Sequence, residues 1–136
     1  MTIVVDASAA LYLLASEAGI DPFASQGLVS PALLWSEVTS VLNEMRWRKE
    51  LSSSLAEEVF GRLLGAPIER HADPDLYRTA RDIAHTLGWA KTYDAEYVAL
   101  AHRLDVPLLS RDERLRRGAG RVITVVAPDE LIPPAH

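Results

Sequence analysis

Short apolar segments alternate with helical segments along most of the chain, and this alternation constrains the fold more than any other feature. The first apolar segment, residues 2–6, is a β-branched run that ends in Asp6 and predicts a buried strand. Strands that are separated by helices form βαβ units, which gather the strands into one parallel sheet with helices on both faces. The sequence therefore predicts an α/β fold, namely a three-layer α/β/α sandwich with a central parallel β-sheet.

Turn and capping residues set the limits of the expected elements. Ser30 as N-cap and Pro31 in the first turn predict the start of a helix that reaches about Lys49. Gly88 and Gly118 each end a helical pattern, and a proline-rich tail that frays from about residue 128 follows the final strand. The expected strands are 2–6, 28–29, 67–71, 106–109 and 121–126, and the expected helices are 8–15, 31–49, 55–64, 74–87, 94–104 and 111–117.

Length and composition exclude several classes of protein. A chain of 136 residues that is 49% hydrophobic is expected to form one domain, residues 1–136, with a sizeable core. The absence of cysteine excludes a disulfide scaffold, a Cys-based zinc site and a thiol nucleophile, and it fits a reducing, cytoplasmic setting. No apolar run approaches the ~18 residues of a membrane helix, and the first basic residue is Arg46, so a secretory signal is not expected.

The net charge of -5 argues against a protein that grips nucleic acid by bulk basicity. It leaves open a site in which acids collect metal ions while local arginine clusters meet phosphate. One basic cluster spans residues 46–49, where Trp47 could stack on a base or pack on a partner. A second basic cluster, beside Asp112, could clamp phosphates and contains Arg111, Arg114, Arg116 and Arg117, with Arg121 close behind. The alternative for both clusters, which we favour for runs of charged residues, is a solvent-exposed surface without a binding role.

Familiar catalytic motifs are missing from the sequence. It contains no GxxxxGK[ST] loop, no GxGxxG after a strand, no HExxH and no GxSxG elbow. The four histidines show no metal-ligand spacing. Nucleotide-cofactor, zinc-protease and serine-hydrolase functions are therefore disfavoured, and the acidic residues become the main candidates.

Two acids in the first third of the chain stand out. Asp6 closes the first strand, where an open parallel sheet binds its ligands, although Asp6 or Ser8 could instead simply cap the next helix. Glu37 falls within the apolar stripe of its helix, between Leu34 and Val41. A buried carboxylate needs a hydrogen-bond donor, an arginine or a metal ion, unless Glu37 lies at an edge turned toward solvent.

Two later acids also have both a structural and a functional interpretation. Asp94 opens a predicted helix, where aspartate is a favoured N-cap. Ser110 and Glu113 have the spacing of a capping box, in which Asp112 would favour the positive end of the helix dipole. Asp112 also follows a predicted strand, at the same edge of the sheet as Asp6, so a capping role and a site role are compatible.

Taken together, the sequence segments around these four acids resemble the PIN domain, and within it the VapC ribonuclease toxins of bacterial toxin–antitoxin pairs. The resemblance runs from residue 3 to about residue 126, and its most specific part is the Tyr-Asp-Ala block. The matching stretches are Val-Val-Asp-Ala-Ser at 4–8, a Pro-x-x-x-x-x-Glu helix at 31–37, Tyr-Asp-Ala-x-Tyr-x-Ala-Leu-Ala at 93–101 and Leu-Leu-Ser-Arg-Asp at 108–112.

The resemblance implies a PIN-like fold and a Mg²⁺- or Mn²⁺-dependent endoribonuclease that leaves a 5′-phosphate and a 3′-hydroxyl. Carboxylates suit such hard cations, and Asp6 and Asp94 are expected to hold the principal ion while Glu37 and Asp112 complete its shell. Ser110, which stands where the family has Thr or Ser, and Ser8 would support the site. Because metal-free acids repel one another, activity should fall at low pH and vanish with a chelator.

The resemblance also implies partners, namely an RNA substrate, a second copy of the chain in a homodimer and a cognate VapB-like antitoxin that inserts a basic side chain among the acids. Two other functions remain open from the residues alone. One is a catalytically inactive PIN-like module that binds RNA or protein. The other is a phosphoryl-transfer domain that uses Asp6, such as a receiver, although the acidic pair and late lysine of receivers are missing. The candidate apolar contacts for partners, which could equally be core, are Leu11, Tyr12, Leu14, Leu34 and Trp35.

Overall fold

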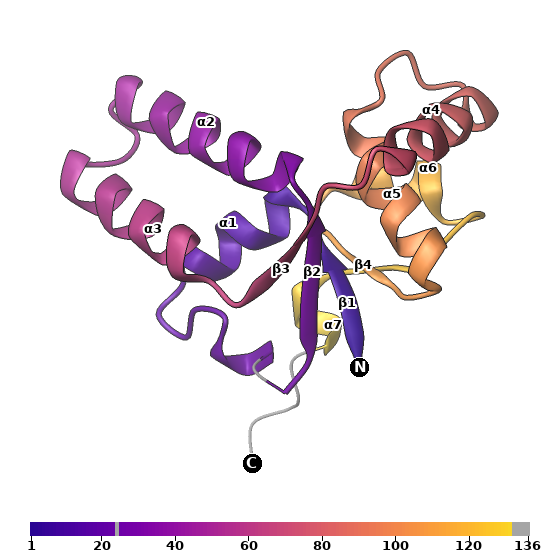
Figure 1. The fold of residues 1–136 in the computed structure, drawn as a ribbon. Coiled ribbons are helices and arrows are strands. Elements are labelled where there is room, and N and C mark those ends of the chain that lie inside the picture. Colours follow the sequence, from indigo (N-terminus) through magenta and orange to yellow (C-terminus); the bar gives the residue numbers. More distant parts are fainter. Residues whose placement is uncertain (24, 132–136) are drawn as a thin grey trace.

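Five strands form one parallel sheet in the order β3-β2-β1-β4-β5. The structure is a computed structural model that describes residues 1–23 and 25–131. β1, from the amino end of the chain, lies in the middle of the sheet, and both of its edges are paired (Figure 1). The strands are β1 (Thr2–Val5), β2 (Gly27–Pro31), β3 (Ile68–His71), β4 (Leu108–Leu109) and β5 (Val125–Val126).

Helices cover both faces of this sheet, which confirms the predicted three-layer α/β/α architecture. One face carries α1 (Ala7–Ala15), α2 (Leu33–Trp47) and α3 (Ser53–Gly65), and the other carries α4 (Asp75–Leu87), α5 (Tyr93–Leu104) and α6 (Glu113–Ala119) (Figure 1). A 3₁₀ turn spans Asp21–Phe23, and a short helix, α7, spans Pro128–Leu131. Among the described residues, no helix has the length and apolar character to cross a membrane.

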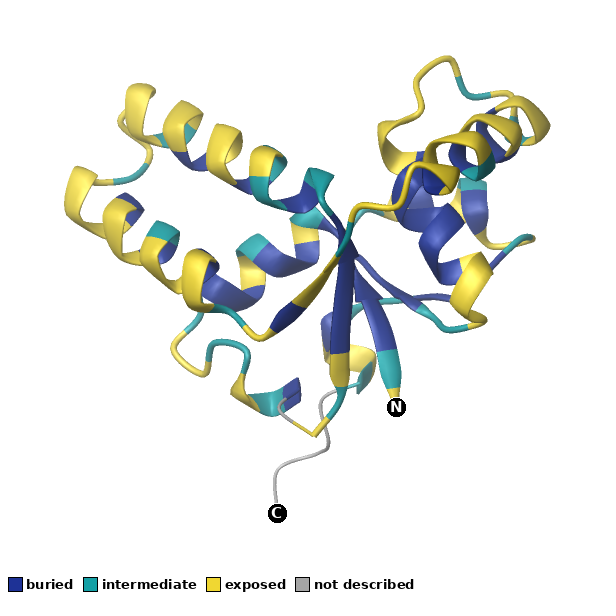
Figure 2. Cartoon of the chain, viewed as in Figure 1, coloured by how far each residue is buried: buried dark blue, intermediate teal, exposed yellow. Residues whose placement is uncertain are grey.

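The core lies between the sheet and the two helical layers, as the dark blue segments of Figure 2 show. Ile3, Val4 and Val5 are fully buried because β1 has a strand on each side and helices above and below it. On the other side of the sheet, every residue of 95–101 in α5 is buried. α5 therefore packs against the sheet with little freedom, and its first turn is held in a fixed position.

The structure corrects several predicted boundaries. Ser30 and Pro31 do not start α2, because both continue β2 and pair with β3 through Arg70 and His71. The Ser30 hydroxyl donates a buried hydrogen bond to the carbonyl of Val5 at 2.8 Å, so its oxygen serves the sheet rather than a helix cap. α2 begins two residues later, at Leu33. Pairing between parallel strands thus outweighs the local preference for a Ser-Pro helix start.

The carboxyl-terminal part also differs from expectation. β4 and β5 are two-residue strands, shorter than the predicted 106–109 and 121–126. Where a frayed tail was expected, residues 128–131 form α7, whose Glu130 accepts hydrogen bonds from the backbone of Ala127 and from Arg116. The remaining part of the predicted tail, residues 132–136, lies outside the described residues.

Adjacent leucines on α3 provide a test of this packing. Leu63 is fully buried, whereas Leu64 is 65% exposed. Leu63→Ala should lower the free energy of unfolding by about 2–5 kcal/mol because it leaves a cavity, and Leu64→Ala should change it by less than about 0.5 kcal/mol. Urea unfolding followed by circular dichroism measures both values. Equal effects of the two substitutions would contradict the packing of α3.

Candidate functional site

Asp6 lies at the carboxyl end of the central strand, where it is only 5% exposed. Its Oδ1 atom accepts hydrogen bonds from the Ser8 hydroxyl at 2.7 Å and from the Ala9 backbone N–H at 2.9 Å. Its Oδ2 atom accepts a hydrogen bond from the Ser110 hydroxyl at 2.5 Å. Ser110 follows β4, which pairs with β1, so the parallel register brings two strand ends together at this point. Asp6 is therefore both the N-cap of α1 and the centre of a hydroxyl network.

Burial makes the Asp6 carboxylate costly to ionise. The pKa of Asp6 is raised from 3.8 to about 6, chiefly by loss of water on burial and, to a smaller extent, by the negative charge of Asp94. The hydrogen bonds from Ser110, Ala9 and Ser8 act in the opposite direction, because they favour the ionised form. The network thus offsets part, but not all, of the penalty for keeping a charge beneath the protein surface.

Glu37 projects from α2 toward α5 and is half-buried. Its Oε1 atom accepts a hydrogen bond from the hydroxyl of Tyr97, a fully buried side chain, at 2.6 Å. Burial raises the pKa of Glu37, the Tyr97 hydroxyl lowers it and the charge of Asp94 raises it. The donor to this carboxylate is therefore a tyrosine rather than an arginine, and the half-buried Glu37 keeps part of its surface open to solvent.

Asp94 lies in the first turn of α5 rather than at its cap. The helix starts at Tyr93, and Thr92 occupies the N-cap position, so the interpretation of Asp94 as an N-cap is wrong. The Asp94 residue has exposed area but faces a cavity, where neighbouring protein displaces part of its water. This desolvation and the charge of Asp112 raise the pKa of Asp94, while the Arg114 guanidinium lowers it.

Asp112 caps α6 with its own side chain. Its Oδ1 atom accepts hydrogen bonds from the backbone N–H groups of Arg114 at 2.9 Å and Leu115 at 3.3 Å. The expected capping box of Ser110 and Glu113 is wrong, because the Ser110 hydroxyl donates to Asp6 and accepts from the Asp112 backbone N–H. Capping leaves the Asp112 carboxylate in the wall of the same cavity as the other acids.

The structure brings the four predicted acids around one cavity of about 320 Å³, together with Ser8 and Tyr97. Within residues 1–23 and 25–131, however, no three acidic or histidine side chains already form a closed metal site. The donor set fits a hard divalent cation, because it consists of carboxylates whose pKa values are raised at Asp6, Glu37 and Asp94. Metal binding stays a prediction for these four acids, which are Asp6, Glu37, Asp94 and Asp112.

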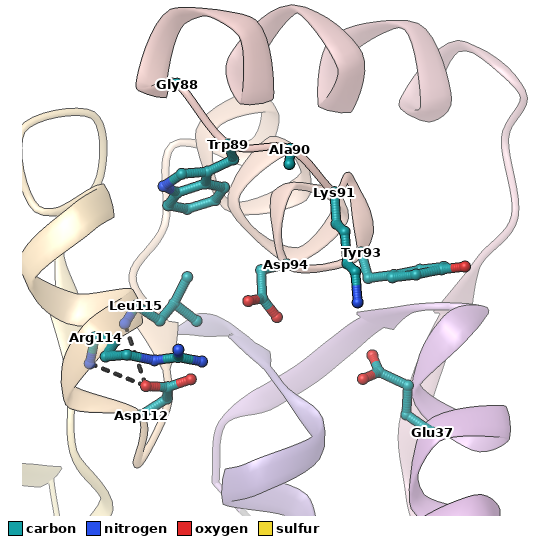
Figure 3. A pocket seen from close by; sticks show the side chains of 10 residues that line it. All are labelled: Glu37, Gly88, Trp89, Ala90, Lys91, Tyr93, Asp94, Asp112, Arg114 and Leu115. Carbon is teal, nitrogen blue, oxygen red and sulfur yellow. Dashed lines mark hydrogen bonds between the residues drawn. The ribbon is translucent and has the colours of Figure 1, made fainter.

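A second, larger cavity of about 600 Å³ shares Glu37, Asp94 and Asp112 with the first (Figure 3). Most of its wall is the segment 88–94, which comprises the connection between α4 and α5 and the first residues of α5, with Arg114 and Leu115 opposite. Sequence reasoning missed the side chains that this connection contributes. They are Trp89, Lys91 and Tyr93, and the available signal was that they lie just before Asp94, at the start of the most specific motif or directly upstream of it.

Sequence reasoning also missed Glu96, a buried acid on α5. Burial and the nearby charge of Glu37 raise the pKa of Glu96. Its signal in the sequence was a charged residue in an otherwise apolar helical run, 95–101. Glu96 adds negative potential behind Glu37.

The four candidate arginines have different environments. Arg114 lines the larger cavity beside Asp94 and Asp112. The guanidinium of Arg111 lies 4.1 Å from the ring centre of Tyr12, a cation–π contact. Arg116 is paired with Glu130 through both guanidinium nitrogens, so it is engaged in holding α7 against α6. Arg117 is exposed and does not line either cavity. Only Arg114 is thus close to the acids.

The residues predicted to contact a partner differ in their burial. Leu14 and Leu34 are buried in the core, so they cannot contact a partner. Leu11 and Trp35 are partly buried, and Tyr12 is exposed. Trp47 is 76% exposed, but it lies ten residues beyond Glu37 on α2, about 15 Å along the helix axis. It does not line the acidic cavity, which weakens its proposed role as a base-stacking residue there.

The cost of ionising Asp6 predicts how its removal affects stability. Because the pKa is raised on folding, the destabilisation is absent below pH 3.8, grows as the pH rises and is complete above about pH 6. Asp6→Asn should therefore raise the unfolding free energy at pH 8 by up to about 3 kcal/mol, with little effect at pH 3.5, since asparagine caps a helix as well as aspartate. Urea unfolding of the metal-free protein measures this. Asp82→Asn, an exposed aspartate on α4, is the control, and a destabilised Asp6→Asn at pH 8 would contradict the account.

The bond between Tyr97 and Glu37 can be tested by removing one hydroxyl. Tyr97→Phe should raise the pKa of Glu37, because the hydroxyl favours the ionised carboxylate, and should cost about 1–2 kcal/mol of stability. Carbon-13 NMR of the glutamate carboxyl groups follows the titration. Tyr77→Phe, an exposed tyrosine on α4, should leave the Glu37 signal unchanged. A Glu37 titration that Tyr97→Phe does not move would show that the bond has no effect on that carboxylate.

Comparisons with known proteins identify the family of the chain. A family model of the PIN domain matches residues 3–121. Ribonuclease VapC1 from Mycobacterium tuberculosis (strain ATCC 25618 / H37Rv) is 34% identical over 124 residues, covering 86% of this chain and 90% of the relative. The solved structure of PAE2754 from Pyrobaculum aerophilum has a TM-score of 0.77 at 22% identity, covering 97% of this chain and 93% of that one.

A complex also has a similar fold. VapBC2 from Rickettsia felis, solved bound to a DNA fragment from the promoter, contains a chain with a TM-score of 0.65 at 9% identity, covering 93% of this chain and 98% of that one. At this identity the likeness concerns the fold alone, whereas the family match and the 34% identity concern the sequence. The chain thus belongs to the PIN-domain family, as a relative of the VapC ribonucleases.

Proposed function

We propose that this protein is a metal-dependent endoribonuclease that hydrolyses phosphodiester bonds of RNA and acts as the toxin of a toxin–antitoxin pair. The observation that carries the proposal is the meeting of four carboxylates, from four separate segments, around one cavity. Its relative VapC1, with 34% identity, bears the name of a ribonuclease. We further propose that residues 1–136 form a single PIN domain.

The proposal assigns the metal to the four acids. Asp6 and Asp94 would hold a Mg²⁺ or Mn²⁺ ion, and Glu37 and Asp112 would complete its surroundings directly or through water. The chemistry that such an ion supplies when bound is Lewis-acid stabilisation of the phosphoryl oxygens and of hydroxide formed from water. The expected products are a 5′-phosphate and a 3′-hydroxyl.

The chain's own residues prepare this site before any substrate arrives. Ser8 and Ser110 fix both oxygens of Asp6, so the carboxylate cannot rotate away from the cavity. Tyr97 fixes one oxygen of Glu37, and two backbone N–H groups of α6 fix one oxygen of Asp112. Because these bonds already exist, little reorganisation is needed when charge develops on the scissile phosphate. The Arg114 side chain, beside Asp94, is the cation placed to attract that phosphate.

The proposed partners follow from the relatives. VapBC complexes of Rickettsia felis and Haemophilus influenzae contain chains of similar fold, so we propose that a VapB-like antitoxin neutralises this chain. A basic antitoxin side chain would enter the cavity and pair with acids that repel one another. We also propose a homodimer, and a cytoplasmic site of action where cellular RNA is present. The exposed aromatic side chains Tyr12 and Trp47 are candidate contacts for either protein partner.

Cleavage of total RNA tests the proposal. The purified protein should degrade RNA with Mg²⁺ or Mn²⁺ and stop when EDTA is added. Asp94→Asn should lower the rate by about a hundredfold or more, since loss of a mere outer-shell partner of a metal ligand already costs about 10–100-fold. Gel electrophoresis measures the rate.

Asp82→Asn, which changes an exposed aspartate that does not line either cavity, should cut RNA like the wild type. Cleavage that ignores EDTA, or that survives Asp94→Asn, would refute a metal mechanism at this site. Binding of RNA without any cleavage would favour the other candidate, a PIN-like binding module, which is also compatible with carboxylates that are not yet gathered to ligand distances.

A further inference from the structure

The short loop from Ser110 to Asp112 is held at both ends by the carboxyl-terminal part of the chain. At its start, the Ser110 backbone N–H donates a hydrogen bond to the carbonyl of Val126, the last residue of β5, at 2.9 Å. At its end, Asp112 caps α6, and the Arg116 side chain of α6 pairs with Glu130 of α7 through both guanidinium nitrogens. The two anchors of the loop, Val126 and Glu130, are only four residues apart in the sequence.

Glu130 connects three parts of the chain through one carboxylate. Its Oε1 atom accepts a hydrogen bond from the Ala127 backbone N–H at 3.1 Å, which is the contact that a glutamate at the third position of a helix makes with the residue before the first. Its Oε2 atom accepts a hydrogen bond from Nη2 of Arg116 at 3.0 Å. α7 has only four residues, far fewer than the roughly 12 that make an isolated helix even marginally stable. Glu130 therefore fixes α7 directly after β5 and links it to α6.

α6 has few other contacts that could hold it in place. It is seven residues long, and of these Leu115 and Ala119 are buried. Near its end, Gly118 lies so close to the Trp89 indole that a Cβ atom on the glycine would be 3.0 Å from Cζ2 of the ring. In the described part of the chain, Arg116 is the only α6 residue whose side chain forms an ion pair. The pair with α7 is thus a main constraint on the helix that begins at the capping carboxylate.

We propose that Glu130 and Arg116 are positioning residues for the acidic site, because together they hold the loop that presents Asp112 to the other three acids. Both act from a distance, since neither of them lines either cavity. The match to the family model ends at residue 121 and does not include α7. The consequence for metal binding rests on the proposed function, because Asp112 is one of the proposed metal-binding acids, whereas the position of the loop does not.

Hydrogen exchange in the metal-free protein tests the position of the loop. The backbone N–H groups of Arg114 and Leu115 donate to Oδ1 of Asp112, so their exchange rates report how often this carboxylate leaves its place. Glu130→Ala should speed the exchange of both groups by about two- to tenfold, because it removes an ion pair and a capping hydrogen bond. NMR spectroscopy of the full-length protein measures both rates.

The chain offers a matched control on the other face of the sheet. Glu58 of α3 pairs with Arg62, and the side chains of this pair and of the pair between Arg116 and Glu130 are all at least 39% exposed. Glu58→Ala therefore removes an ion pair of the same kind away from the loop. It should leave the exchange of the Arg114 and Leu115 N–H groups unchanged.

Metal affinity tests the consequence for the site. Electron paramagnetic resonance of free Mn²⁺, without RNA, gives the affinity of the full-length protein for this ion. Glu130→Ala should weaken Mn²⁺ binding by about three- to tenfold, which is less than the 10–100-fold that loss of a direct partner of a metal ligand costs. Glu58→Ala should leave the Mn²⁺ affinity unchanged.

A second substitution separates positioning from a general loss of stability. Asp112→Asn removes the charged ligand but keeps the cap of α6, because asparagine caps a helix as well as aspartate. If Glu130 acts through Asp112, then Glu130→Ala should change the Mn²⁺ affinity of the Asp112→Asn protein by less than about twofold. Loosening of the whole protein would instead lower the affinity by the same factor in both backgrounds.

Two milder variants isolate the ion pair. Glu130→Gln keeps the capping contact with Ala127, since glutamine also serves at this position, but loses the charge that pairs with Arg116. Arg116→Gln breaks the same pair from the other side. Both should give exchange rates and Mn²⁺ affinities between those of the wild type and of Glu130→Ala.

The outcomes distinguish the inference from the proposed function. Unchanged exchange at Arg114 and Leu115 in Glu130→Ala, or an equal loss of Mn²⁺ affinity with and without Asp112, would overturn the positioning role whatever the cleavage assay shows. Faster exchange in Glu130→Ala, together with a wild type that neither binds Mn²⁺ nor cuts RNA, would overturn the metal-dependent nuclease and leave the positioning of the loop standing.

Discussion

A carboxylate buried at the end of the central strand is the constraint on which the rest of the site depends. Asp6 cannot move without breaking the cap of α1, and its two oxygens are held by hydroxyls from different segments of the chain, Ser8 and Ser110. The fold buries a carboxyl group that is hard to ionise, because the pKa of Asp6 is raised to about 6. A stability cost of this kind is common where a site needs a charged group in a defined position. Every other acid of the cavity is arranged around this one.

The fold could be predicted from the sequence to a large extent, because the alternation of apolar strands and helices is strong and repeated. The parallel sheet, its helical layers and the Gly88 helix stop, with φ of 72°, are all confirmed. The start of α2 could not be predicted, because the Ser30-Pro31 signal is local while the pairing of β2 with β3 joins residues about forty positions apart. Likewise, nothing near residues 128–131 indicates that Arg116 and Glu130 will stabilise a terminal helix.

For the candidate site, the sequence indicated which acids lie together but not what orients them. Asp6 and Asp112 follow paired strands, so their meeting at one sheet edge is a consequence of topology that a reader of the sequence can anticipate. Tyr97 as the partner of Glu37 depends on how α5 rotates against α2, which no local pattern encodes. The cavity wall at 88–94 was missed for a related reason. A connection between helices has no periodicity from which the direction of its side chains could be inferred.

The contact between Gly118 and Trp89 has a consequence for how relatives of this protein could diverge. A hydrogen in place of a side chain lets α6 approach the indole, and the indole forms one wall of the larger cavity. An alanine at this position would press a methyl group against the ring and shift it by a few tenths of an ångström. A substitution at position 118 would thus change the width of the cavity without changing any residue that lines it. Relatives could in this way differ in which ligands fit while keeping all four acids.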